Sequence, residues 1–449
     1  MTEKKIILKH AGTVLLGQIA VVAFGVTDTV IAGRYEPQAL AVLSVSSAIY
    51  ISVYVSLLGV IQALLPIFAE LFGAKKLESI GYHFRQALYI WLILSILGAM
   101  ILLSPYFLLH LTQVPESVQP YIQTYLGTLA IAIPAALFFR LYSSLNQSIG
   151  KPRLITWIQI SALIVKIPLS ILLTFGTTEY PGLGILGCAL ATVIVSYLMC
   201  FVAIWLLHTN EIYKSFQVWC SLEKPDLVKL MKMVKLGIPN GFSVLVEVTS
   251  FTLMALFIAR LGTMATASHQ IAANMTALIY MIPLSFSIAV SARLSYWIGA
   301  KNNLNVLKVI RIGFQVIILE STFIACILFL FSDSIADLYA KDESVKQVAA
   351  KLLILVGFFH VVDAIQTLCF FILRSFKIAL LPFIVYGTML WGIGLTGGYF
   401  LAYKGLGMYA PMESPEAFWI MSVIALAFVC ICLIYIIIKN LPKNKINQD

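Results

Sequence analysis

Twelve long apolar runs, each about as long as a membrane is thick, constrain this chain more than any other feature of its sequence. A helix needs roughly 20 mainly apolar residues to cross the hydrocarbon core of a bilayer. The composition agrees, because hydrophobic residues make up 61% of the chain and charged residues only 11%. A soluble domain carries about 25% charged residues. This composition therefore excludes a soluble enzyme, a disordered regulator or a disulfide scaffold.

The runs predict an all-α, polytopic membrane protein with twelve transmembrane helices. They are continuous rather than short and alternating, so a transmembrane β-barrel is excluded. An even number of spans places both termini on the same side of the membrane. The expected spans are 10–33, 40–70, 87–109, 120–146, 154–176, 183–208, 236–260, 266–299, 309–331, 352–373, 378–402 and 417–438.

The distribution of basic residues predicts the orientation of the chain. Of the 30 Lys and Arg residues, 23 fall in one set of tails, loops and adjoining helix ends, Arg140 among them, and 6 fall in the other set. Lys166 is left inside a span. Loops rich in Lys and Arg stay in the cytoplasm, so both termini are expected there. The net charge of +10 is then a signal of topology, and we expect no nucleic-acid partner.

Short motifs recur at an offset close to half the chain length, which indicates an internal repeat. Such repeats of membrane spans are typical of transporters, whose substrate site lies between the halves. We therefore expect two pseudo-symmetric six-helix lobes, residues 1–208 and 236–449, joined by a polar cytoplasmic linker, residues 209–235. The matching pairs are Gly73–Lys75 with Gly299–Lys301 and Gly150–Leu154 with Phe376–Leu380 at an offset of 226, and Glu116–Val118 with Glu343–Val345 at an offset of 227.

Two acidic residues, Glu247 and Asp363, lie deep inside spans of the C-terminal half. Each is 11 residues from the expected start of its span. At 1.5 Å per residue each lies roughly 16 Å deep, and the two spans enter from opposite faces. Charges inside spans are expensive and are functional candidates by default. The pair could load and release a proton, or supply oxygen ligands to Na⁺. The alternative is a structural hydrogen bond to a neighbouring helix.

The N-terminal half contains one acid and one base within spans, Asp28 and Lys166. We expect the two side chains to form an ion pair, because an unpaired charge inside a span is costly. The fixed ammonium of Lys166 would then occupy the place of a mobile cation beside Asp28. Lys166 could instead bind backbone carbonyls freed by Pro168, two residues further on. Asp28 could also be a polar helix end near the interface, with Thr27 and Thr29 beside it.

The remaining candidates point to structural roles. Glu320 lies midway along a span without a polar face around it, and His269 and His360 are expected to form structural hydrogen bonds. The stretch Gly182–Gly187 fits a dinucleotide-binding pattern, but no strand precedes it, so close helix packing is the better interpretation. The sequence has no P-loop, H-E-x-x-H or G-x-S-x-G motif. We predict no enzyme, no catalytic residue and no cofactor other than a coupling ion.

Four stretches, at positions that span most of the chain, resemble the multidrug and toxic compound extrusion (MATE) family in its NorM-like bacterial branch. They are Val26–Gly33, Val246–Thr249, Ala267–Ala272 and Val362–Gln366. The resemblance implies a membrane antiporter with two six-helix lobes in the bacterial cytoplasmic (inner) membrane. It implies export of small amphiphilic organic cations in exchange for Na⁺ or H⁺, by a protein expected to be a monomer.

The resemblance also assigns residues. It implies that Glu247 and Asp363 form a cation-coupling site, which could hold Na⁺, that Asp28 is a further coupling acid, and that Tyr280 lies near the cation. Two positions depart from the family pattern: Phe359 stands where members often have Tyr, and Lys166 where they often have Asn. Both are expected to line the path of cation or substrate. An ammonium beside Asp28 would weaken the proton affinity of that acid. Coupling is therefore expected at Glu247 and Asp363.

Three alternatives remain at this point. A flippase for lipid-linked oligosaccharides shares a related fold, but should carry an arginine-rich groove for pyrophosphate. An intramembrane enzyme would need a nucleophile or a metal constellation. A channel would pass single-channel current instead of exchanging substrates at fixed stoichiometry.

Overall fold

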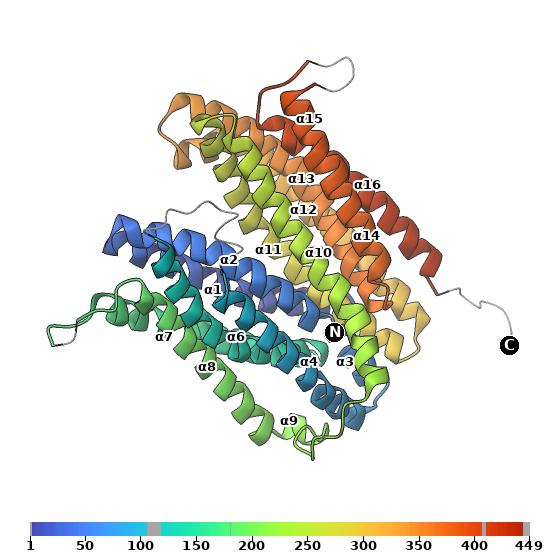
Figure 1. Ribbon diagram of the computed structural model, residues 1–449. Helices are drawn as coiled ribbons and strands as arrows, with labels where there is room; N and C mark the ends of the chain where they lie inside the picture. Colours follow the sequence, from blue (N-terminus) through green and yellow to red (C-terminus); the bar gives the residue numbers. More distant parts are fainter. Residues whose placement is uncertain (1, 106–117, 180, 406–409, 443–449) are drawn as a thin grey trace. The chain divides into compact units, whose positions relative to one another are not determined.

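The computed structural model describes residues 2–105, 118–179, 181–405 and 410–442 (Figure 1). Within these residues twelve helical segments are long and apolar enough to cross a membrane, which confirms the predicted fold class. In the second and eleventh segments two or more helices follow one another. The helices are α1 (Glu3–Tyr35), α2 (Pro37–Gln62), α3 (Leu65–Gly73), α4 (Leu77–Leu103), α6 (Gln119–Ser148), α7 (Pro152–Phe175), α8 (Leu186–Thr209), α9 (Glu211–Lys214), α10 (Leu227–Ala259), α11 (Thr263–Gly299), α12 (Asn303–Tyr339), α13 (Glu343–Ser375), α14 (Leu380–Met389), the π-helix η1 (Leu390–Gly397), α15 (Gly398–Tyr403) and α16 (Glu416–Asn440).

Several helices begin earlier than the hydropathy predicts. Helix α10 begins at Leu227 where 236 was expected, and α13 begins at Glu343 where 352 was expected. A helix satisfies its own backbone hydrogen bonds, so it can continue past the hydrocarbon through charged residues that favour helix. Helix α4 ends at Leu103, short of the expected 109, and residues 106–109 lie outside the described part of the chain.

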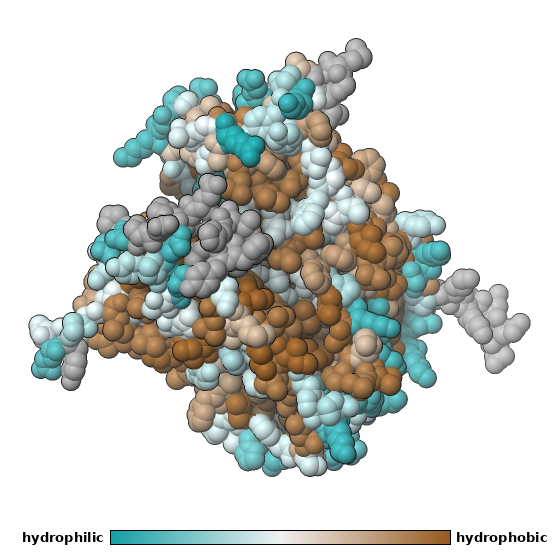
Figure 2. All heavy atoms as spheres, in the orientation of Figure 1, coloured by the Kyte–Doolittle hydropathy of each residue, from teal (hydrophilic) through white to brown (hydrophobic). Residues whose placement is uncertain are grey.

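Many helix faces expose large apolar side chains, as a lipid solvent requires. Ile93, Trp157, Leu319 and Leu330 are each more than 60% exposed. Hydrophobic residues cover much of the surface visible in Figure 2. In water, contiguous apolar patches of this kind would drive aggregation.

The chain divides into two compact units, each with its own hydrophobic core. We call residues 13–241 the N-terminal unit, and residues 1–12 together with 242–449 the C-terminal unit. Helix α6 is central in the first unit, where it packs against α2, α4 and α8. Helix α13 is central in the second, where it packs against α11, α12 and α16. These central helices carry most of the buried residues and so position the buried polar groups described below.

The internal repeat extends to individual backbone hydrogen bonds. The amides of Ala74, Lys75 and Lys76 bond the carbonyls of Glu70, Phe72 and Leu71 after α3. Residues 300–302 repeat this pattern after α11 at an offset of 226. Lys75 and Lys301 both adopt positive φ, 57° and 54°, which closes the helix end.

The second repeat match needs a correction of one residue. The pattern that ends α6, with Gly150 at φ 72°, recurs at Lys377 with φ 63°, so the offset there is 227 and not 226. Of the third match, Glu116 and Ser117 lie outside the described residues.

The Gly182–Gly187 stretch packs directly on the end of α7, as the sequence predicted. A Cβ atom at Gly187 would lie 2.5 Å from the backbone of Leu173, and one at Gly182 would lie 2.2 Å from the carbonyl oxygen of Thr174. Backbone atoms cannot move aside as a flexible side chain can, so only glycine fits at these contacts.

The polar segment between α9 and α10 is held against α4. The Arg85 guanidinium donates two hydrogen bonds to the Glu223 carboxylate and one to the Gln217 carbonyl. Gln86 accepts from the backbone amide of Asp226 at 2.8 Å, and Tyr89 donates to the carbonyl of Glu223 at 2.8 Å. This ion pair holds the pKa of the Glu223 carboxyl below its usual value, chiefly through the hydrogen bonds from Arg85.

Candidate functional site

Glu247 and Asp363 come from α10 and α13 and interact electrostatically inside the C-terminal unit. Each lies 20 residues after the first residue of its helix, Leu227 and Glu343, and 12 residues before the last. Both acids therefore lie well inside their spans. Asp363 is only 5% exposed. The structure thus brings together the two carboxylates that the sequence singled out.

Two tyrosine side chains complete this group. Tyr280 of α11 and Tyr386 of α14 both interact electrostatically with Glu247 and Asp363, and Tyr280 also interacts with Thr367. Tyr280 is the residue that the family resemblance placed near a bound cation, and that role stays a prediction. Tyr386 was missed, because a single tyrosine in an apolar run carries no signal that distinguishes it from other aromatic residues of spans.

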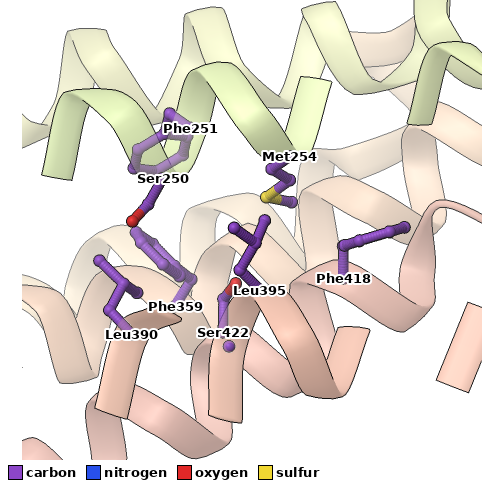
Figure 3. A pocket seen from close by; sticks show the side chains of 9 residues that line it. Ser250, Phe251, Met254, Phe359, Leu390, Leu395, Phe418 and Ser422 are labelled. Atoms are coloured by element: carbon purple, nitrogen blue, oxygen red, sulfur yellow. The ribbon is translucent and has the colours of Figure 1, made fainter. Parts of the chain in front are cut away.

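Phe359 lies one helical turn before Asp363, against an aromatic cluster. Its ring is 5.9 Å from that of Phe251 and 5.5 Å from that of Trp419, between centroids. These aromatic contacts pack Phe359 between α10 and α16. Figure 3 shows Phe359 with Phe251 of α10 and Phe418 of α16.

A small cavity of about 20 Å³ lies beside Phe359. Ser250 and Ser422 are its polar lining residues, and Ser250 lies three residues after Glu247 on α10 (Figure 3). A volume of this size holds about one water molecule. The cavity is lined by Ser250, Phe251, Met254, Phe359, Leu390, Gly394, Leu395, Phe418 and Ser422.

The acidic group offers oxygen ligands only. Among the described residues, no cluster of three or more His, Cys, Asp or Glu side chains could hold a metal ion. Two carboxylates and the neighbouring phenol oxygens are hard donors, which suit a small hard cation or a proton and do not suit a soft transition metal.

Asp28 and Lys166 form an ion pair inside the N-terminal unit. The Nζ atom of Lys166 lies 3.0 Å from Oδ1 of Asp28, and the lysine side chain is fully buried. Lys166 also donates to the Thr192 hydroxyl at 2.6 Å. The lysine therefore uses an acid and a hydroxyl, and not the carbonyls freed by Pro168 that were the alternative.

The neighbouring threonines do not support Asp28. Thr27 donates to the carbonyl of Ala23 at 2.8 Å, and Thr29 donates to that of Gly25 at 2.9 Å. Both bonds stay within α1, as is common for threonine in membrane helices. The positive charge that stabilises the Asp28 carboxylate thus comes from Lys166 alone among the described residues.

The two candidate histidines differ in what they contact. Trp419 donates its indole N–H to Nδ1 of His269 at 3.3 Å, which confirms a structural hydrogen bond. His360 is 1% exposed, and its Nε2 lies 3.6 Å from Oε1 of Glu320. That separation is too long for a hydrogen bond, so the two side chains are neighbours, and Nε2 of His360 does not form the expected structural hydrogen bond within the described residues.

Arg140 lies inside α6, within the span expected at 120–146. It was counted among residues of loops and helix ends, but it lies eight residues before the end of α6 and is only 8% exposed. Its Nε donates to the Tyr54 hydroxyl at 3.1 Å. Its burial depends on how neighbouring helices pack on this end of α6, which the sequence does not give.

Two bundles of membrane-spanning helices, each with ionisable side chains buried in its spans, define a polytopic membrane transporter. The chain belongs to the MatE family, whose model matches residues 14–172 and 239–400. Membership makes it a membrane transporter and not an enzyme.

Curated relatives match the chain over nearly its whole length. A protein of Aromatoleum aromaticum named "Probable multidrug resistance protein NorM" is 34% identical, over 97% of this chain and 94% of the relative. A protein of Chromobacterium violaceum with the same name is 30% identical, over 100% of this chain and 96% of the relative.

Solved structures of the same fold are more distant in sequence. The eukaryotic MATE transporter AtDTX14 superposes with a TM-score of 0.86 at 18% identity, over 97% of this chain and 95% of that one. The Vibrio cholerae MATE transporter VcmN in its bent form superposes with a TM-score of 0.85 at 18% identity, over 98% of this chain and 97% of that one. At these identities the structures establish the fold.

Proposed function

We propose that this protein is a secondary active multidrug efflux antiporter, which exports small amphiphilic organic cations in exchange for Na⁺ or H⁺. The observation that carries the proposal is the pair Glu247 and Asp363, two acids that interact electrostatically within their spans and with Tyr280. Family membership and the names of the curated relatives support the same function.

Exchange follows if drug and coupling ion compete for this acidic group. The carboxylates attract an organic cation, and aromatic side chains bind its apolar part. When the site opens to the outside, Na⁺ or a proton binds the acids and displaces the drug. One charge that crosses 100 mV contributes about 2.3 kcal/mol. The two states of the transporter must differ in affinity for both ligands, since otherwise no exchange results.

The N-terminal unit contributes differently. Lys166 places its ammonium group 3.0 Å from Asp28. A mobile cation gains little beside an acid that is already neutralised. We therefore assign coupling to Glu247 and Asp363, and assign Asp28 the role of holding the lysine.

The arrangement in the cell completes the proposal. The multi-pass protein lies in the bacterial cytoplasmic membrane with both termini inside, as the bias of basic residues favours. The lobes 1–208 and 236–449 alternate access around the linker 209–235, and the protein acts as a monomer.

Vesicles containing the purified protein and a cationic dye test the coupling. Na⁺ and pH gradients are imposed separately, and dye efflux is followed. Glu247→Gln and Asp363→Asn should each lower gradient-driven efflux by at least tenfold, because each removes a charge that both ligands need. Wild-type rates in both variants would show that the coupling site lies elsewhere.

A further inference from the structure

Arg140 differs from the other buried basic residues of the N-terminal unit in its partners. Lys166 is paired with Asp28, and Arg85 is paired with Glu223. For Arg140 the described residues supply no carboxylate within 4 Å, and its one side-chain hydrogen bond goes to the neutral hydroxyl of Tyr54. Among the described residues, Arg140 is thus only 8% exposed and its guanidinium has no carboxylate partner.

Such a charge needs an explanation. Arginine stays protonated in proteins, so Arg140 cannot become neutral as a buried lysine can. An uncompensated buried charge costs several kcal/mol. Arg140 is eight residues, roughly 12 Å, from the end of α6, which is further than its side chain extends. It therefore cannot reach the end of its helix to be solvated there.

The surroundings of Arg140 orient its guanidinium. The Tyr54 hydroxyl accepts a hydrogen bond from Nε of Arg140 at 3.1 Å. The Tyr54 ring stacks on that of Tyr50, with centroids 5.6 Å apart and planes 3° from parallel. Tyr50 also interacts electrostatically with Arg140. The Nη1 and Nη2 nitrogens have no hydrogen-bond partner within the described residues, and neither is fully sealed from the surface. They present a two-pronged donor beside a pair of half-buried aromatic rings.

We propose that Arg140, Tyr50 and Tyr54 form a substrate-binding site for the carboxylate end of amphiphiles that carry both a positive and a negative charge. The two Nη donors match the two oxygens of a carboxylate, and one guanidinium neutralises its single charge. The stacked tyrosines supply a flat apolar surface for an aromatic substrate. This inference rests on the proposed efflux function and assigns three residues of the N-terminal unit to one end of its substrates.

Two dyes that differ in one group test the proposal. Rhodamine 110 carries a free carboxylate, and rhodamine 123 is its methyl ester, so the ester lacks the negative charge. Efflux of each dye is measured from vesicles containing the wild type, Arg140→Gln or Arg140→Lys. Arg140→Gln should lower efflux of rhodamine 110 by about tenfold or more, as expected for a lost charge-assisted pair, and leave rhodamine 123 within twofold. Efflux of rhodamine 110 by Arg140→Lys should lie between that of the wild type and that of Arg140→Gln, since lysine keeps the positive charge but cannot donate two parallel hydrogen bonds.

Three results would overturn the site. The wild type could export rhodamine 123 but not rhodamine 110, Arg140→Gln could lower both dyes equally, or it could change neither. If Arg140→Gln does not fold, Tyr54→Phe decides, because losing the hydroxyl that orients the guanidinium should slow only rhodamine 110. Failure of the wild type to export either dye would instead contradict the efflux function itself.

Discussion

Lys166 and Asp28 lie 3.0 Å apart in the N-terminal unit, with the lysine fully buried, and this pair separates the protein from a transporter with a free acid at the same place. The ammonium group of Lys166 lies directly beside the carboxylate. The pair thus acts as an internal counter-ion, and its removal should change how many external cations the protein uses.

Lys166→Asn should therefore add a cation requirement. With the ammonium gone, the Asp28 carboxylate needs a proton or Na⁺ to enter the same buried environment, because an unpaired buried charge is costly. Dye efflux from vesicles should then depend more steeply on the imposed Na⁺ or pH gradient than in the wild type. The double variant Lys166→Asn/Asp28→Asn lacks both charges and should return to wild-type steepness. Unchanged steepness in the single variant would remove the counter-ion role.

Phe359→Tyr should strengthen cation binding at the acidic group. The cavity of about 20 Å³ beside Phe359 has room for one added oxygen, and Phe359 lies one turn before Asp363. A further hard oxygen near two carboxylates should raise apparent Na⁺ affinity several-fold, as seen in the Na⁺ dependence of efflux. Phe251→Tyr, on another ring of the same cavity, serves as the matched control. Equal effects of the two variants, or none, would contradict the prediction.

Glu320 and His360 should stabilise the C-terminal unit only as a pair. Their nearest atoms are 3.6 Å apart, and among the described residues neither group has a hydrogen bond to satisfy it. His360→Leu alone leaves a carboxyl group without its partner and should cost about 3 kcal/mol. The double variant Glu320→Leu/His360→Leu should cost less than His360→Leu alone, because removing both polar groups is nearly neutral. Thermal unfolding in detergent measures both, and strictly additive losses would show that the two side chains do not interact.

The contact between Arg85 and Glu223 should make stability depend on pH. Because Arg85 lowers the pKa of the Glu223 carboxyl in the folded protein, the pair stabilises the fold above the usual pKa of about 4.5. That contribution is lost as the pH falls through the lowered value, where the folded carboxyl gains its proton. Glu223→Gln should lower the melting temperature by about 1–2 °C at pH 7, and the difference from wild type should shrink on acidification toward pH 4. A constant difference across this range would contradict the assignment.

The sequence determined the number of spans, the class of protein and the depth of its charged residues. These follow from one-dimensional physics, because lipid demands apolar runs of a set length and penalises each charge within them. Glu247 and Asp363 could be matched in this way from the sequence alone, since depth depends only on counting residues along a helix. The same reasoning placed the starts of α10 and α13 nine residues too late, because a helix need not end where the hydrocarbon does.

Only the tertiary structure decided which buried groups meet. Counting residues gives depth but not the direction in which a side chain points around its helix axis, and that direction depends on how neighbouring helices pack. Tyr386 joins the acids, Glu320 faces His360, and Arg140 lies buried beside Tyr54 for this reason. None of these three contacts leaves a pattern in the sequence, because each joins side chains from helices that are separate in the chain.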